Sequence, residues 1–371
     1  MTRLLIATVI SVVLAAIAEQ RDRMLSPWGY EYKERLVTGI TMIFLSFFCG
    51  LRIWGNDTVT YMQIYQQTPV LNEYTLDSFA SGIGFGLTVS TLKTLGLSTQ
   101  DFLLFFAFLT VIPYVLFVRR FSTSFSFGIY LMFATGMYTF SMAAVKQCMA
   151  TGICLMALSL ALDRRWGRYC LAILLATLFH PYSLIYLAVP FMMFKPWTPR
   201  TLVCVLMALV LGFYLDSLIG TVLDITAMMG AEYTADTFVG EGVNVFRVAV
   251  AFVPLMLAFI YGKPLFRNTT REEDLMFNLA MLNALIMFIG LFGTANYFAR
   301  LANYFLPAQV IALPWLLKKT APMDQAWLKP ACIVGYLGYF YYEYGILHSF
   351  DVEYAQISLF DYLEDLLGRL L

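Results

Sequence analysis

Long apolar runs that follow one another almost without polar interruption constrain this chain more than any other feature. Hydrophobic residues make up 60% of its 371 residues and charged residues only 13%, whereas soluble domains carry about 25% charged residues. A bilayer core about 30 Å thick needs about 20 apolar residues per helix. The sequence therefore predicts an all-α polytopic membrane protein. Its candidate membrane segments are the runs 3–18, 36–53, 79–95, 101–118, 125–141, 145–162, 168–180, 182–194, 201–219, 246–262, 274–293, 299–317 and 329–344.

Basic clusters lie between alternate runs and indicate how the chain is oriented. Lysine and arginine gather in cytoplasmic loops, and seventeen of the 24 basic residues fall on one side if the run 79–95 does not cross the membrane. That run is rich in Gly, Ser and Thr, so we assign it as a re-entrant or interfacial segment. We therefore predict about twelve transmembrane helices, with both termini on the external side.

This orientation predicts a single membrane domain, 1–371, with external loops at 54–78 and 220–245. Residues 345–371 alternate leucine and phenylalanine with acidic residues, in a pattern typical of an amphipathic helix. We expect this external tail to lie on the outer interface or to pack on an external loop.

Three of the apolar runs need separate interpretation. The run 3–18 ends in a sequence similar to a signal-peptidase site, but the basic cluster follows the run, so we expect a retained first helix. The runs 168–180 and 182–194 reach only about 20 Å each at 1.5 Å per residue. They meet at His180, which we therefore expect in a cavity below the outer surface.

Composition excludes several classes of protein. The chain has 24 basic and 24 acidic residues, which argues against the basic surface of a nucleic-acid-binding protein. Its six cysteines lie in or beside apolar runs without a CxxC pair, so we interpret them as free thiols. Only two histidines are present and no external Asp-x-Asp motif occurs. We predict neither a bound metal nor a cofactor.

Four basic residues depart from the positive-inside tendency in the same way. Arg52, Lys146, Arg247 and Arg300 each lie at the external end of a separate predicted span. Each could extend singly to lipid head groups, but four together predict a shared positive cavity that faces outward. Guanidinium groups bind phosphate oxygens in a bidentate way, and lysine adds a point charge. Such a cavity suits a phosphate or pyrophosphate that enters from the membrane, as lipid-linked sugars do.

Two of these cations stand in polar surroundings. After Arg52, the residues Gly55-Asn56-Asp57 predict a turn, in which Asp57 caps a helix that carries Tyr61 on the same face. A polar and aromatic stripe of four residues surrounds Arg300 at helical spacing: Asn296, Tyr297, Asn303 and Tyr304. We interpret the stripe as a ligand wall; the alternative is polar contact between helices within an interfacial aromatic belt.

These residues resemble the EpsG-like proteins, which are Wzy-type bacterial surface-polysaccharide polymerases. The resemblance rests on motifs that follow one another in order along roughly residues 36–310: Gly50-Leu51-Arg52, Gly55-Asn56-Asp57-Thr58 with Tyr61, Lys146-Gln147, Ala176-Thr177-Leu178-Phe179-His180, and Arg300 to Tyr304. The family usually shows Arg-Gln where this chain has Lys146-Gln147. Lysine keeps the charge there but lacks the bidentate guanidinium.

The resemblance implies a fold, a reaction and partners. The family joins oligosaccharide units carried on undecaprenyl pyrophosphate at the outer face of the bacterial inner membrane, and related enzymes have the C-type glycosyltransferase architecture with a site at that face. The implied partners are the lipid-linked donor and acceptor and membrane lipid. A separate chain-length regulator is a further candidate partner.

A mechanism follows as a hypothesis. The four cations would bind the pyrophosphates and stabilise the one that departs. The acceptor hydroxyl needs a general base, for which Asp57, His180, Glu232 and Asp236 are the candidates. The alternative for Asp57 is that it only pairs with Arg52, and a histidine before proline is often structural. The residues that would line the substrate are Tyr61, Gln147, Asn296, Tyr297, Asn303 and Tyr304.

Other functions remain open at the level of sequence. A lipid-linked oligosaccharide transporter would suit twelve spans, but transporters usually carry midplane charges and repeated halves. Another lipid-linked glycosyltransferase is a second alternative, although a ligase-like protein would be expected to carry a larger external loop. A structural membrane subunit would have no use for the four cations.

Overall fold

The structure is a computed structural model, and every regular element that it describes is a helix. The described residues are 1–25, 33–73, 82–214, 242–293, 295–349 and 355–370. Within them, one isolated antiparallel bridge pairs Arg52 with Gln356. The chain divides into two compact units, unit 1 with Met1–Leu187 and Ala331–Leu371, and unit 2 with Ala188–Pro330. The all-helical architecture predicted from the sequence is confirmed.

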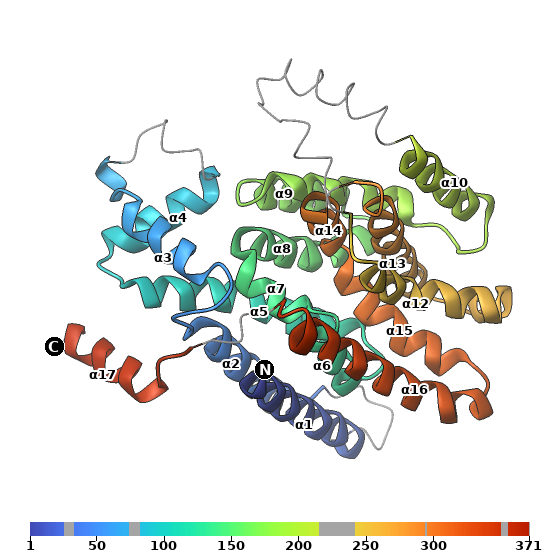
Figure 1. The fold of residues 1–371 in the computed structure, drawn as a ribbon, viewed down its shortest axis with the longest axis horizontal. Helices are drawn as coiled ribbons and strands as arrows, with labels where there is room; N and C mark the ends of the chain where they lie inside the picture. The colour runs from blue at the N-terminus through green and yellow to red at the C-terminus, as the bar shows by residue number, and fades with distance from the viewer. Residues whose placement is uncertain (26–32, 74–81, 215–241, 294, 350–354, 371) are drawn as a thin grey trace. The chain divides into compact units, whose positions relative to one another are not determined.

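Unit 1 is organised around one long helix, α5, which contacts α2, α3, α6, α7 and α8 (Figure 1). A second set of contacts joins α1 to α2 and α6. The helices of this unit are α1 (Thr2–Leu25), α2 (Leu36–Gly50), α3 (Thr58–Gln67), η1 (Leu71–Glu73), α4 (Ile83–Thr94), α5 (Thr99–Phe121), α6 (Phe125–Ala134), α7 (Met137–Ala143), α8 (Val145–Leu162), α9 (Trp166–Thr177), η6 (Tyr342–Ile346) and α17 (Leu359–Leu370). The 3-10 helix η3 (Pro181–Met192) leads from unit 1 into unit 2, and α16 (Pro322–Tyr341) leads back.

Local sequence fixes where α5 begins. Ser98 accepts a hydrogen bond from the Asp101 amide at 3.2 Å, and the Asp101 carboxylate accepts one from the Ser98 amide at 2.7 Å. This capping box satisfies two amides that a helix start otherwise leaves without partners. From there α5 runs for 23 residues, about 35 Å at 1.5 Å per residue, which is long enough to cross a bilayer.

A glycine allows α2 to approach α5 closely. A Cβ atom on Gly50 would lie 2.7 Å from the Leu104 Cα atom of α5. Only a residue without a side chain fits at that separation, because neither backbone can move without disturbing its helix. Gly50 is also the last residue of α2. This contact therefore fixes the position along α5 at which the following loop, residues 51–57, begins.

Unit 2 is organised around α13, which contacts α10, α12, α14 and α15 (Figure 1). A capping box between Thr270 and Glu273 begins α13, as Ser98 and Asp101 begin α5. The helices that lie wholly within this unit are α10 (Pro199–Phe213), α12 (Val245–Tyr261), η5 (Lys263–Phe266), α13 (Arg271–Ile289), α14 (Ala295–Asn303) and α15 (Leu306–Lys319).

A buried amide on α13 holds the chain that enters α10, and its removal should destabilise unit 2. The fully buried Asn278 donates from Nδ2 to the carbonyls of Met192 at 2.8 Å and Phe194 at 2.7 Å. Because Asn278→Ala leaves both carbonyls without that donor, we expect about 1–2 kcal/mol lower stability. Thermal unfolding in detergent measures this, with the exposed Asn268→Ala as control. An unchanged midpoint would contradict the expectation.

In the part of the chain that the structure describes, three helices are long and apolar enough to cross a membrane: α1, α5 and α8. Five shorter apolar helices accompany them among the described residues: α2, α6, η3, α10 and α12. The chain is therefore a helical membrane protein, while the predicted number of twelve spans stays a prediction. The segment predicted as re-entrant, 79–95, contains α4, whose 12 residues reach about 18 Å.

Two apolar runs that the sequence predicts as continuous are broken in the structure. The run 125–141 is interrupted by Gly136, which has φ of 82° and ends α6 in the left-handed conformation that favours glycine. The run 299–317 is interrupted at Tyr304, after which Pro307 lies in the first turn of α15. A helix continuous through Pro307 would lose the hydrogen bond to the Asn303 carbonyl, because proline has no amide hydrogen.

The junction at His180 agrees with the sequence. Helix α9 ends at Thr177, and η3 begins at Pro181, so both elements are short and the histidine lies in the connection between them. The amphipathic helix expected in the tail is present as α17, and residues 355–357 pair with residues 51–53 of the loop between α2 and α3, which we call the Arg52 loop (residues 51–57). The external placement of the tail stays a prediction.

Candidate functional site

Arg52 is a buried residue that joins three helices of unit 1. It lies two residues after α2, and its side chain is only 1% exposed. Its Nη1 donates to the Cys49 carbonyl at 2.6 Å, its Nε to Thr58 Oγ1 at 3.0 Å, and its Nη2 to the Met142 carbonyl at 3.4 Å. All these acceptors are neutral, and no carboxylate of the described residues forms an ion pair with it. Arg52 thus keeps a net positive charge inside unit 1.

The predicted turn after Arg52 is present. Gly55 and Asn56 have φ of 102° and 47°, as a glycine–asparagine turn requires. Asp57 then takes the N-cap position of α3, but its side chain makes no capping hydrogen bond. The carboxylate is exposed and has no partner among the residues that the structure describes. Arg52 contacts the neighbouring Thr58 instead, so the alternative in which Asp57 only pairs with Arg52 does not describe this structure.

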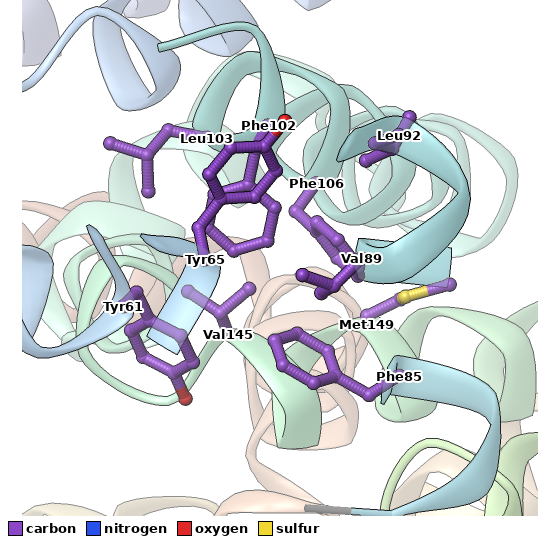
Figure 2. Packing of buried hydrophobic residues seen from close by; sticks show 10 residues of the cluster. All are labelled: Tyr61, Tyr65, Phe85, Val89, Leu92, Phe102, Leu103, Phe106, Val145 and Met149. Carbon is purple, nitrogen blue, oxygen red and sulfur yellow. The ribbon is translucent and has the colours of Figure 1, made fainter. Parts of the chain in front are cut away.

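Lys146 is linked to α3 through an aromatic residue of α4. Its ammonium nitrogen is 4.8 Å from the centroid of the Phe85 ring of α4, a cation–π distance. The Tyr61 ring of α3 packs edge-on to Phe85 with centroids 6.1 Å apart. Figure 2 shows the Tyr61 hydroxyl directed away from the packed rings of Tyr65 and Phe102. Arg52 contacts Thr58, Tyr61 donates its amide to the Asp57 carbonyl at 3.0 Å, and the Tyr61 ring leads through Phe85 to Lys146. We call these six residues the α3 site.

Arg52 also connects the two sides of the α3 site. Its bond to Thr58 holds the first residue of α3, and its bond to Met142 holds the end of α7, three residues before α8 begins. Lys146 is the second residue of α8, as the sequence predicts for the start of a helix. Gln147 follows it and is 2% exposed. The buried guanidinium thus positions both the helix that follows Asp57 and the helix that carries Lys146.

The motif that ends in His180 supports α4. The Leu178 carbonyl accepts a hydrogen bond from the Gly84 amide at 2.7 Å, and a Cβ atom on Gly84 would lie 2.8 Å from the Leu178 Cβ atom. Phe179 packs against the cluster that contains Phe85. His180 is half-buried and packs edge-on to Tyr182 with ring centroids 5.2 Å apart. A catalytic role for His180 stays a prediction.

Unit 2 carries the other two predicted cations. Arg247 is half-buried and is the third residue of α12, whose start is capped by the Asn244 side chain. Arg300 is exposed on α14. The four cations thus divide evenly between the units, Arg52 and Lys146 in unit 1 and the other two in unit 2. The shared cavity stays a prediction.

The predicted stripe around Arg300 is only partly a surface. Tyr297 and Asn303 are half-buried on α14, whereas Tyr304 lies beyond its end and is fully buried. Asn296 belongs to α14, but its side chain falls outside the described residues. Behind the stripe, Asn283 of α13 donates to the Ala302 carbonyl at 2.8 Å. Their roles in lining a substrate stay predictions.

Two predicted general bases, Glu232 and Asp236, fall outside the described residues, as does most of the loop 220–245. Among the described residues, no three His, Cys, Asp or Glu side chains lie close enough to hold a metal ion.

Unit 2 also contains an apolar cavity of about 980 Å³. Side chains of α10, α12 and α13 line it, among them Phe252, Phe259 and Met281, with Lys263 at its edge. Arg247 lies at the opposite end of α12 from Phe259 and Lys263. The predicted topology places this cavity in the cytoplasmic half of the membrane, and that placement stays a prediction.

Sequence reasoning missed the neutral partners of Arg52. Thr58 was part of a motif but had no assigned role, and the Cys49 and Met142 carbonyls carry no signal in a sequence. The same holds for Gln100 of α5, whose Nε2 donates to the Gly50 carbonyl at 2.6 Å and the Arg52 carbonyl at 3.3 Å.

Comparison with known families decides the affiliation of the chain. The EpsG family model matches residues 35–357, a range that includes the α3 site, the His180 motif and Arg300. The chain belongs to the EpsG family. A comparison with the curated proteins and with the solved structures finds no match. EpsG is a family of Wzy-like polysaccharide polymerases, so the chain is a membrane protein of polysaccharide-polymerase type. Helix α17 follows the matched range.

Proposed function

We propose that this chain is a glycosyltransferase that joins oligosaccharide units carried on undecaprenyl pyrophosphate. The observation that carries the proposal is the EpsG family match over residues 35–357. In this proposal the site lies at the outer face of the bacterial inner membrane, within a C-type glycosyltransferase architecture. The donor and the acceptor are both lipid-linked glycans, and a chain-length regulator is a candidate partner.

The positions of two cations support binding of pyrophosphate. Lys146 and Arg247 both lie in the first turn of a helix, α8 and α12 respectively. The first turn already carries the positive end of the helix dipole, so a cation there costs up to about 1 kcal/mol and an anion gains a similar amount. A pyrophosphate bound near such a turn would offset this cost. Its negative charge interacts favourably both with the free helix amides and with the cationic side chain.

The proposed reaction is a displacement at the anomeric carbon of the donor. Asp57 takes the proton of an acceptor hydroxyl, whose oxygen then forms a bond to that carbon. The bond from the carbon to the pyrophosphate oxygen breaks, and the lipid pyrophosphate leaves with the electron pair. Because this group leaves as an anion, no general acid is needed, and Lys146, Arg247 and Arg300 stabilise its charge. In this scheme the cations replace a metal ion.

Arg52 has two roles in the proposed reaction, one electrostatic and one structural. Its charge, which no carboxylate of the described residues neutralises, adds to the positive potential felt by a phosphate near Lys146. Its hydrogen bonds to Thr58 and Met142 fix the start of α3, next to Asp57, relative to the end of α7, which precedes the helix that carries Lys146. Direct contact of the guanidinium with pyrophosphate would require a shift of the loop, since the side chain is 1% exposed.

The decisive test is polymerisation by the purified protein alone. A synthetic repeat unit linked to undecaprenyl pyrophosphate is supplied in EDTA, without nucleotide sugar or ATP, and the products are separated on a gel. We expect a ladder of products that differ by one repeat unit. Folded protein that forms no ladder from a cognate substrate would refute the proposal, and a ladder that disappears only in EDTA would refute its metal-independent form. A flipping assay in liposomes then tests a transporter instead.

A further inference from the structure

Residues 355–357, at the end of the family match, pack against the Arg52 loop, and helix α17, which follows the match, packs against the start of α5. Residues 355–357 run antiparallel to this loop: the Ile53 amide donates to the Ala355 carbonyl at 2.9 Å, and the Ile357 amide donates to the Leu51 carbonyl at 3.0 Å. The Gln356 side chain donates to the Phe48 carbonyl at 2.5 Å. We call residues 355–370, which include α17, the C-terminal segment.

The Asp101 carboxylate joins the C-terminal segment to the start of α5 by binding two side chains of α17. Tyr362 donates its hydroxyl proton to Asp101 Oδ1 at 2.7 Å. Arg369 approaches the same carboxylate with both terminal nitrogens, Nη1 at 2.5 Å from Oδ2 and Nη2 at 3.4 Å from Oδ1. The Asp101 side chain is only 7% exposed. A bidentate pair with one partner largely removed from water is stronger and more directional than a surface pair.

The start of α5 binds the Arg52 loop as well as the C-terminal segment. Gln100 donates to the Gly50 and Arg52 carbonyls, while the adjacent Asp101 binds Tyr362 and Arg369. The loop, the first turn of α5 and the C-terminal segment therefore contact one another pairwise. Each of the three is held by hydrogen bonds to the other two, so the contacts at Asp101 support the pairing of residues 355–357 with the Arg52 loop.

We propose that Tyr362 and Arg369 are positioning residues: through Asp101 they hold residues 355–357 against the Arg52 loop and so fix the α3 site for catalysis. This inference rests on the proposed function for its catalytic readout. Neither residue contacts the α3 site directly. They act through the backbone bridge at Arg52, whose side chain holds Thr58 and the end of α7.

The protonation of the two groups suits this role. Burial and the Asp101 carboxylate raise the pKa of Tyr362 to about 12. The hydrogen bond to Asp101 raises the pKa of Arg369 above its ordinary value. Tyr362 therefore keeps the proton that it donates, and Arg369 keeps its charge, throughout the physiological pH range.

Hydrogen exchange tests, without any substrate, whether Arg369 holds residues 355–357 against the Arg52 loop. In Arg369→Ala we expect faster exchange of the Ile53 and Ile357 amides, which make the two backbone bonds of the bridge. Asp365→Asn is the matched control: Asp365 also pairs with Arg369, at 3.0 Å, but is itself 60% exposed. Its loss should leave both amides protected. Equal protection in Arg369→Ala and wild-type protein would overturn the proposal.

Kinetics test the catalytic part. For Arg369→Ala we expect kcat to fall about tenfold, because the bidentate contact with Asp101 is lost. We expect KM for the lipid-linked unit to stay within about twofold, because the segment contacts no substrate. Tyr362→Phe should lower kcat about threefold, and Arg369→Lys should restore most of it because the charge is kept.

The possible outcomes are distinguishable. A fall in kcat/KM caused by KM alone would overturn the positioning role and place the C-terminal segment at the substrate. If Arg369→Ala does not fold, Tyr362→Phe carries the same test, because it removes the second contact with Asp101. If wild-type protein forms no ladder, the proposed function fails, and the exchange measurement still decides whether Asp101 fastens the segment to the loop.

Discussion

Arg52→Ala should abolish polymerisation and lower the stability of the protein. The substitution removes a buried side chain and leaves the Cys49 and Met142 carbonyls without their donor. An unsatisfied buried group costs about 1–3 kcal/mol, and the space left by the side chain adds to that cost. Because Arg52 joins the start of α3 to the end of α7, the α3 site would lose both its charge and its register. We expect no ladder and a lower unfolding midpoint.

A conservative variant separates charge from geometry at this position. Arg52→Lys keeps the charge but cannot reach Thr58, Cys49 and Met142 together, since an ammonium lacks the planar fork of guanidinium. We expect the protein to fold and to form a ladder at least about tenfold more slowly, the equivalent of one hydrogen bond to a charged group. Arg120→Ala, a change at an exposed cation in the last turn of α5, is the control. Normal product lengths and rates from folded Arg52→Ala would exclude Arg52 from the reaction.

Arg300→Ala should also abolish the ladder, with a much smaller loss of stability than Arg52→Ala. Arg300 is exposed on α14, and surface substitutions usually change stability by no more than about 0.5 kcal/mol. If its guanidinium stabilises a departing pyrophosphate, the loss falls on the reaction alone, by about a hundredfold to a thousandfold in kcat for one electrostatic donor. Rates from the ladder and unfolding midpoints should be measured on the same preparation.

The contrast between the two arginines makes this prediction specific. Arg300→Lys should recover part of the rate, because the point charge remains while the bidentate contact is lost. Arg267→Ala, at another exposed arginine of unit 2, should behave like wild-type protein. A slower ladder accompanied by an equally large loss of stability would show that Arg300 supports the fold of α14, and an unchanged ladder would show that it has no part in the reaction.

Local patterns in the sequence predicted some of the local structure and missed two breaks between helices. The Gly55-Asn56 turn has the positive φ values that this pair favours, and α8 begins one residue before Lys146. The break at Gly136 was missed because the residues on both sides are apolar, so periodicity continues across a position where the backbone turns. The break before α15 was missed for the same reason, although Pro307 was a signal that a helix begins anew there.

Long-range contacts could not be predicted in the same way. The sequence indicated that Arg52 is unusual, because a cation stood at the external end of a span. It could not indicate that the guanidinium is buried, since its acceptors are mostly backbone carbonyls and every residue type provides one. Nor could it choose Asp101 as the partner of Arg369, because the capping box with Ser98 already accounted for an acidic residue at that position.

The C-terminal segment has a consequence for biosynthesis. Gln356 binds a carbonyl 308 positions earlier in the chain, and Tyr362 binds a carboxylate 261 positions earlier. At about 5–20 residues per second, the ribosome finishes α17 many seconds after α2 and α5 have left it. The Arg52 loop therefore lacks these contacts until the C-terminal segment has been made. A nascent or C-terminally truncated chain would carry every motif of the family, yet its α3 site would lack the contacts that hold the loop in place.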